Sequence, residues 1–265
     1  MKKRIFQRFA LPTLTAFVLL FSTLSLHSAD RVRIARLNGE ITLDGRPDEP
    51  AWTQATPFDL IMHVPNAGAQ PGERSDIWMA YDNEYLYVGA RLYVSDPSRI
   101  SSNSTKRDEQ SRNTDVFGII LDTYDDNENA LAFFTMPSGA RIDYSVGNDA
   151  ESSGGPERST NLSWNTFWDV ETQMDDQGWY VEMRIPFSSL RFQSVDGISE
   201  MGLIINRRIA ALNETDTWPM TDPKYGFSAY YKPSLAQTVE FQDVKARKPL
   251  YISPYIIGDF PGTMP

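Results

Sequence analysis

Cysteine is absent from this 265-residue sequence, and histidine is nearly absent. Without cysteine the chain has no disulfide, no thiolate metal site, no catalytic thiol and no cysteine for a lipid anchor. Of the two histidines, His27 lies in an N-terminal segment described below, so His63 alone is left to the rest of the chain. One histidine excludes most zinc sites, and its place in or beside a loop favours a solvated or structural role.

Sequence motifs for nucleophilic catalysis and for phosphate binding are also absent. No serine lies in a GxSxG elbow, and neither GxGxxG nor a phosphate-binding loop occurs. Positive charge is scarce, because 25 Lys and Arg face 35 Asp and Glu, for a formal net charge of −10. Such an acidic chain is a poor candidate for binding nucleic acid or anionic lipid. Carboxylates are abundant, so a glycosidase pair across a cleft stays open as an alternative.

The N-terminal residues 1–29 have the features of a secretory signal peptide. Four basic residues open the chain, an apolar run follows to about Leu26, and Ser28-Ala29 offers a cleavage site; the basic residues are Lys2, Lys3, Arg4 and Arg8. An uncleaved anchor is the alternative, but the run is short for a spanning helix. Cleavage would leave a net charge of 21 − 35 = −14. We therefore expect an exported protein, in the periplasm or at the outer membrane of a Gram-negative bacterium.

The clearest strand signal lies in residues 179–185, where apolar Trp179, Val181, Met183 and Ile185 alternate with polar positions. Pro186 cannot donate to a sheet ladder, so the strand should end there. Similar short strands are predicted at residues 32–37, 77–81, 86–94, 116–121, 130–136, 140–146, 203–210 and 238–244. No amphipathic helix longer than about three turns is visible. These features predict an all-β fold, a jelly-roll-like antiparallel β-sandwich with a few short helical turns.

The domain organisation follows from these signals. Residues 30–248 are predicted to form one β-sandwich domain. Residues 249–265 differ in kind, being apolar, prone to β structure and cut off within their pattern. They predict the start of a truncated C-terminal region, and a frayed terminal strand is the alternative.

Aromatic residues are the main candidates for binding, because rings pack against the C–H faces of sugars. Trp164 and Trp168 are the predicted platforms, with Arg107, Asp108 and Asn165 as hydrogen-bonding partners. Trp52 is expected in the core. Trp78 points away from the core of its predicted hairpin, which fits either a binding role or packing under a loop.

One acidic turn offers a candidate metal site. Asp122, Asp125 and Asp126 lie in the sequence DTYDDNEN, which does not match an EF-hand loop. Calcium accepts oxygen ligands in flexible geometry, so an isolated structural calcium site in this turn is a weaker prediction. Solvated turn carboxylates are the simpler interpretation.

Four spaced blocks resemble the family 9 carbohydrate-binding module: LDGRPDEPAW, YDNEYLYVGARLYVSDPS, KRDEQSRNTDVFGIILDTY and GWYVEMRIPFSSLRF. More narrowly, the chain is similar to the module at the N-terminus of bacterial envelope proteins with a putative C-terminal outer-membrane β-barrel. The resemblance implies a β-sandwich, a sugar held between two tryptophans, and structural calcium. It also implies that residues 251–260 would be a first barrel strand.

Three hypotheses for function follow. The first is an exported carbohydrate-binding module that recognises an oligo- or polysaccharide in carbohydrate catabolism without its own catalysis. The second is a glycoside hydrolase acting on O-glycosyl compounds, or its accessory domain. The third is a periplasmic interaction or plug domain of an outer-membrane barrel, without a sugar site. The exposure of Trp164 and Trp168 should separate the first from the third.

Overall fold

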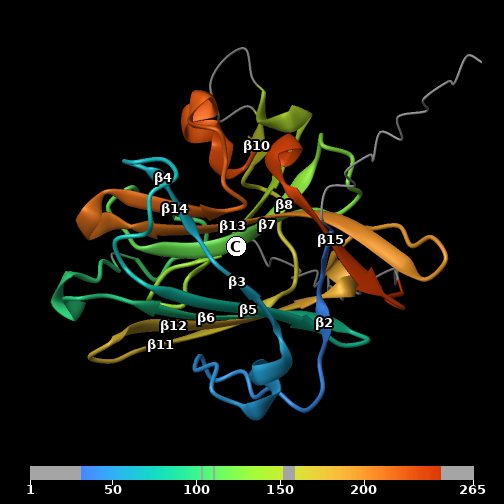
Figure 1. The fold of residues 1–265 in the computed structure, drawn as a ribbon, viewed down its shortest axis with the longest axis horizontal. Coiled ribbons are helices and arrows are strands. Elements are labelled where there is room, and N and C mark those ends of the chain that lie inside the picture. Colours follow the sequence, from blue (N-terminus) through green and yellow to red (C-terminus); the bar gives the residue numbers. More distant parts are fainter. Residues whose placement is uncertain (1–30, 103, 110, 152–158, 246–265) are drawn as a thin grey trace, which may run out of the picture. The chain divides into compact units, whose positions relative to one another are not determined.

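The computed structural model describes residues 31–102, 104–109, 111–151 and 159–245, which form a two-layer β-sandwich (Figure 1). The predicted all-β sandwich is therefore confirmed. The predicted signal peptide, residues 1–29, and the predicted C-terminal region, residues 249–265, lie outside the described residues. Among the described residues, no helix has the length and apolar character needed to cross a membrane.

Within the described residues, the larger sheet has nine strands in the order β1-β15-β13-β7-β8-β9-β10, with β14 paired to β13 and β4 paired to β14. Their bounds are β1 Val32–Arg33, β4 Ile61–Val64, β7 Val116–Asp122, β8 Ala130–Thr135, β9 Arg141–Val146, β10 Thr160–Asn161, β13 Ile198–Ile209, β14 Glu214–Trp218 and β15 Gln237–Gln242.

The smaller sheet has six described strands in the order β11-β12-β6-β5-β2, with β3 paired to β5. They are β2 Ala35–Arg36, β3 Thr56–Phe58, β5 Ser75–Tyr81, β6 Tyr85–Tyr93, β11 Asp169–Met174 and β12 Gly178–Pro186. Pairing is antiparallel except for two short parallel contacts, β1 with β15 and β2 with β5.

Helical structure in the described residues consists of short 3-10 segments. These are η1 Pro50–Gln54, η2 Pro97–Arg99, η3 Asn148–Ala150, η5 Phe187–Ser189, η6 Ala210–Leu212, η7 Pro223–Tyr230 and η8 Pro233–Leu235. Proline at the start of η1, η2, η7 and η8 suits such turns, because its φ is preset and its missing N–H is not needed there.

The main core lies between the two sheets. The alternation in β12 sends Trp179, Val181 and Met183 into this core, where they are at most 1% exposed. Phe117 and Phe133 enter it from the larger sheet. Burying one such side chain stabilises the fold by about 1.5–3 kcal/mol before entropy is counted, so this period-two pattern is the main determinant of the sandwich.

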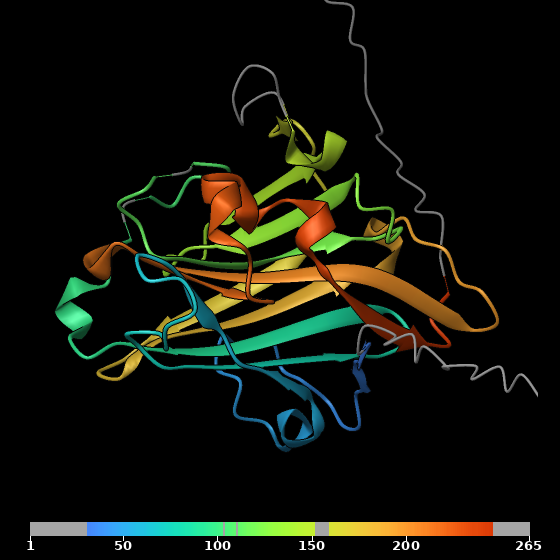
Figure 2. The same cartoon turned by 45° about the horizontal axis from the view of Figure 1, so that its top comes forward.

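Two smaller clusters cover the outer faces of the sheets. On the larger sheet, Phe134 and Tyr144 stack with their ring centroids 6.0 Å apart, and Tyr231, which follows η7, packs in the same cluster. On the smaller sheet, Trp52 packs with Ala80 and other residues of that face. Figure 2 shows the blue segment with η1 beneath the smaller sheet, and the orange-red η7 and η8 above the larger one.

Residues 43–52, which we name the anchor segment, are fixed to the smaller sheet by the buried carboxylate of Glu182 in β12. This carboxylate accepts hydrogen bonds from the amides of Asp44 and Gly45 at 3.0 Å and from the indole of Trp52 at 3.1 Å. Burial raises the pKa of Glu182 to about 7, despite these donors. Gly45 has a φ of +87°, and a Cβ there would lie 2.7 Å from the backbone of Thr172. Trp52 is therefore a core residue, as predicted.

Several strands depart from the sequence prediction. Residues 32–37 split into β1 and β2, which join different sheets on either side of the buried Ile34. Five strands have no counterpart among the predicted ones, namely β3, β4, β10, β11 and β14. Two of these illustrate the cause: β11 is an exposed edge strand of mixed polarity, and β14 is a polar strand buried by its neighbours. Neither has the apolar alternation by which a half-buried strand is recognised.

Candidate functional site

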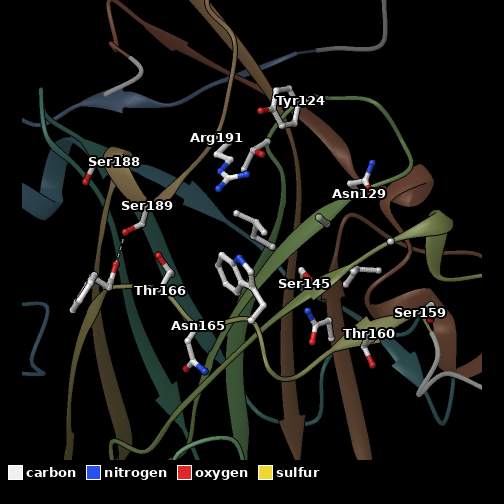
Figure 3. A pocket seen from close by; sticks show the side chains of 18 residues that line it. Tyr124, Asn129, Ser145, Ser159, Thr160, Asn165, Thr166, Ser188, Ser189 and Arg191 are labelled. Carbon is white, nitrogen blue, oxygen red and sulfur yellow. Dashed lines mark hydrogen bonds between the residues drawn. The ribbon is translucent and has the colours of Figure 1, made fainter. Parts of the chain in front are cut away.

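An open cavity of about 730 Å³ lies beside the β8, β9 and β10 side of the larger sheet (Figure 3). It is bounded by the turn after β7, the first residues of β8, the ends of β9 and β10, residues 164–167, and η5 with Arg191 after it. The lining residues are Thr123, Tyr124, Asn129, Ala130, Leu131, Ser145, Val146, Gly147, Ser159, Thr160, Asn161, Trp164, Asn165, Thr166, Phe167, Ser188, Ser189 and Arg191.

The segment of residues 164–168, which we name the aromatic segment, divides its side chains between core and cavity. Trp164 and Trp168 both contact the ring of Phe133 edge-to-face, with centroid distances of 6.0 and 5.5 Å. Trp168 is 2% exposed, whereas Trp164 is half-buried and lines the cavity. Phe167 is 68% exposed and also lines the cavity. The segment therefore offers Trp164 and Phe167 to a ligand, and keeps Trp168 in the core.

Trp168 was predicted as a stacking platform, and this prediction is wrong for the described fold. Its ring belongs to the core between the sheets, where it contacts Phe133. Its carbonyl accepts a hydrogen bond from Arg141 at 2.5 Å, which holds the residue in place. Trp168 thus anchors the segment that presents Trp164.

Hydroxyl and amide groups surround these rings. The lining contains the side chains of serine, threonine and asparagine from five separate stretches of chain, and no carboxylate. Asn165 is exposed and lines the cavity, as its predicted role requires. Tyr124 adds a ring that is 47% exposed. Rings beside neutral donors and acceptors can stack on the C–H faces of a sugar and bond its hydroxyls.

Arg107 and Asp108 lie outside the cavity lining and position the aromatic segment. The buried carboxylate of Asp143 in β9 pairs with the Arg107 guanidinium and accepts a hydrogen bond from the amide of Thr166 at 3.0 Å. Arg107 also donates to the carbonyl of Thr166 at 3.3 Å. Asp108 accepts a hydrogen bond from the Asp143 amide at 3.1 Å. Both predicted residues thus contact the site through Asp143. We name Arg107, Asp108 and Asp143 the brace.

Trp78 lies on the outer face of the smaller sheet, away from the cavity. It is half-buried and packs beside the Trp52 cluster, and the guanidinium of Arg91 lies 5.7 Å from its ring centroid. The structure therefore supports packing under a loop, the alternative given for this residue. Trp78 does not join the other predicted site residues.

The turn that holds Asp122, Asp125 and Asp126 is organised by hydrogen bonds to its own carboxylates. Asp122 accepts from the amides of Tyr124, Asp126 and Asn127, and Asp126 accepts from Glu128 and Asn129. The Thr238 hydroxyl lies 3.3 Å from Asp125. Among the described residues, no group of three or more His, Cys, Asp or Glu could hold a metal ion. These residues therefore fit a turn better than a calcium site.

His63 is a structural residue, as favoured by the sequence. It is 5% exposed, its Nδ1 lies 2.9 Å from the Thr221 hydroxyl, and its Nε2 lies 3.3 Å from the Gly226 carbonyl. An Nε2 proton satisfies both contacts, because Nε2 then donates to the carbonyl and Nδ1 accepts from the hydroxyl. The histidine holds η7 against β4.

A second open cavity, of about 630 Å³, lies at the β11 edge of the smaller sheet. Its lining includes Asp169, Glu171, Arg141 and Arg184. Asp169 is already paired with Arg184 at 2.7 Å. No aromatic ring is among its lining residues, so this cavity lacks the stacking surface of the first one.

Three residues that line the first cavity were missed by sequence reasoning: Tyr124, Phe167 and Arg191. Phe167 lies next to Trp168 in the sequence, and no strand pattern in residues 164–168 indicates which of the two rings is exposed. Tyr124 and Arg191 are brought in by turns distant in sequence, and no local pattern places them.

Comparisons with known proteins were made against family models, curated proteins and solved structures. The family described as carbohydrate family 9 binding domain-like matches residues 43–230. A family 9 carbohydrate-binding module from Caldicellulosiruptor kristjanssonii in complex with glucose is 21% identical, with a TM-score of 0.52, covering 84% of this chain and all of that one. The same organism's module in complex with cellotriose is 20% identical, with a TM-score of 0.50, and covers 86% of this chain and all of that one.

A third solved structure is a putative carbohydrate-binding protein from Bacteroides uniformis ATCC 8492, at 10% identity and a TM-score of 0.58. It covers 80% of this chain and 99% of that one. The comparison with curated proteins found no match. At these identities the solved structures support the fold, and the family match spans most of the sandwich.

Proposed function

Because the chain belongs to the carbohydrate family 9 binding domain-like family, we propose that it binds an oligo- or polysaccharide in the cavity beside the aromatic segment. One observation carries the proposal: the cavity combines the partly or largely exposed rings of Trp164, Phe167 and Tyr124 with uncharged hydrogen-bonding side chains. The complexes of the similar structures with glucose and cellotriose make a sugar the first ligand class to test.

Binding without catalysis is the form of this function that the cavity supports. A glycosidase needs two carboxyl groups about 5 to 9.5 Å apart across the sugar. The lining of this cavity contains no carboxylate. The hydrolase alternative therefore has no pair of acid and base in this cavity.

The interaction or plug-domain alternative expected both Trp164 and Trp168 to be buried. Trp168 meets that expectation, but Trp164 is only half-buried and Phe167 is 68% exposed. The open rings favour a small-molecule site.

A role in carbohydrate catabolism and export through residues 1–29 complete the proposal. Measuring the mass of the protein recovered from cells would test whether the signal peptide is cleaved.

Calorimetric titration with glucose, cellotriose and a broad set of glycans tests the proposed site. We expect modest affinity, since each stacked ring contributes about 1 kcal/mol. Phe167→Ala should then weaken binding about fivefold, because about 1 kcal/mol corresponds to that ratio. Met220→Ala is the matched control, since Met220 is 66% exposed and lies outside the cavity lining. Absence of heat with every glycan, or equal binding by the Phe167 variant, would contradict the proposal.

A further inference from the structure

Arg191 is the one charged residue in the lining of the cavity, in a chain whose net charge is −10. It follows η5 in the chain and is exposed. Figure 3 shows its side chain between Ser189 and Tyr124 at the cavity wall. The local charge of the cavity lining is therefore opposite in sign to that of the protein.

Arg191 differs from the other arginines in the described part of the chain in the contacts that its guanidinium makes. Each of the others has a contact within the protein: for example, Arg184 pairs with Asp169, and Arg99 donates to a carbonyl. Among the described residues, Arg191 has no hydrogen bond, ion pair or ring contact of its own. Its donors are free for a ligand, and a guanidinium matches a carboxylate or sulfate in a two-bond geometry.

The neighbouring side chains fit the same ligand. Tyr124 and Ser188 make no side-chain hydrogen bonds within the described residues, so both hydroxyls are available to a ligand in the same cavity. The rings of Trp164 and Phe167 belong to the same cavity. A sugar stacked on a ring could thus direct a charged substituent toward Arg191.

We infer that the cavity selects saccharides that carry an anionic group, the carboxylate of a uronic acid or a sulfate ester, which Arg191 recognises. The inference rests on the proposed carbohydrate binding and adds the class of sugar. Because the rest of the protein is acidic, attraction to the anion is local to the cavity. Raising the salt concentration should weaken the preference for the anion, since exposed charges are screened.

The experiment compares three trisaccharides by calorimetric titration: cellotriose, the same trimer oxidised to the uronate at C6, and a sulfated cellotriose. We expect one of the anionic trimers to bind about tenfold tighter than cellotriose, because charge-assisted hydrogen bonds are about twice as strong as neutral ones. Which anionic trimer binds better identifies the group. Arg191→Gln should bring the affinity for that trimer down to that of cellotriose, and Arg191→Lys should keep part of the preference.

Arg99→Gln is the control, since it makes the same change of charge at an exposed site outside the cavity lining. It should keep the full preference, and thermal unfolding of each variant checks that it is folded. Cellotriose binding as tightly as both anionic trimers would overturn the inference and leave carbohydrate binding intact. If Arg191→Gln keeps the preference for the anionic trimer, the inference is likewise overturned and carbohydrate binding is left intact. Failure of all three trimers, together with the broad glycan set, would overturn both.

Discussion

The anchor segment and the aromatic segment are both held by a buried carboxylate, yet they differ in how far their aromatic rings are buried. In the anchor segment, Glu182 accepts three hydrogen bonds, and Trp52 is 4% exposed. In the aromatic segment, the brace through Asp143 holds the backbone, while the rings of Trp164 and Phe167 remain open to a cavity. The comparison separates a buried tryptophan, which stabilises the fold, from rings that line a cavity on a backbone held in place, which are suited to a ligand.

The largest loss of stability should come from removing the Glu182 carboxylate, which holds the anchor segment. Glu182→Ala leaves the amides of Asp44 and Gly45 without their acceptor and leaves the Trp52 indole with Glu49 alone, at 3.2 Å. We expect a loss of about 3 kcal/mol in the free energy of unfolding. Glu171→Ala is the matched control, because Glu171 lies opposite Glu182 in the β11–β12 register but is exposed. It should change stability by less than about 0.5 kcal/mol. Denaturant unfolding measures both, and equal effects would contradict the anchoring role.

The pH dependence of stability is a second test of how Glu182 holds the anchor segment. The pKa of Glu182 rises from 4.5 to about 7 on folding, because burial disfavours its charged form. The folded state therefore binds more protons than the unfolded state between these values, and this contribution to stability is lost as pH rises from about 4.5 to about 7. At about 1.4 kcal/mol per pKa unit the loss is at most about 3 to 4 kcal/mol.

Glu182→Gln should flatten this slope, because the amide does not titrate. Burial beside Glu214 also raises the pKa of Asp216, which adds a slope of the same sign and would remain in the variant. Thermal unfolding at several pH values measures the difference. A slope unchanged by the substitution would show that Glu182 titrates as it does in the unfolded chain.

Removing the Asp143 carboxylate from the brace should lower stability less than removing Glu182 does, and should also weaken binding. Asp143→Ala removes the partner of the Arg107 guanidinium and of the Thr166 amide, and should cost about 2 kcal/mol. Because Thr166 lies between the open rings, the variant should also bind carbohydrate more weakly. Asp169→Ala removes an exposed pair with Arg184 and should cost less than about 1 kcal/mol.

This pair of variants also tests how separate the two segments are. Glu182→Ala should leave affinity unchanged in the folded protein, whereas Asp143→Ala should lower it. Unfolding curves and calorimetric titrations on the same preparations give both values. If Asp143→Ala lost stability but kept full affinity, the brace would be framework like the anchor segment.

Sequence reasoning found the parts of the fold that depend on local periodicity. The strand of residues 179–185 became β12, and Trp52 was placed correctly in the core. It failed for β14, whose threonines and acids are buried by neighbours remote in sequence. Burial of polar residues depends on contacts with residues distant in sequence, which no local pattern indicates. The predicted sheets therefore lacked these strands.

For the site, residues 164–168 were predicted to carry the binding platforms. Of the two tryptophans, Trp164 lines the cavity and Trp168 lies in the core. Trp168 was chosen as a platform and Phe167 was not, whereas the structure buries Trp168 and leaves Phe167 68% exposed. Arg107 and Asp108 were near the site for a different reason, since they hold Asp143 and Thr166. Arg191 lies in a turn about 25 residues further along, and only tertiary structure brings it to the cavity.

The indole N–H resonances in an NMR titration test the central claim most directly. The six tryptophans report on the core, the outer face and the cavity separately. On addition of cellotriose or its uronate counterpart, the account predicts a shift of the Trp164 resonance, assigned by Trp164→Phe. The resonances of buried Trp52 and Trp179 should stay in place. Binding measured by calorimetry with no shift at Trp164, or with the main shift at Trp78, would contradict the account.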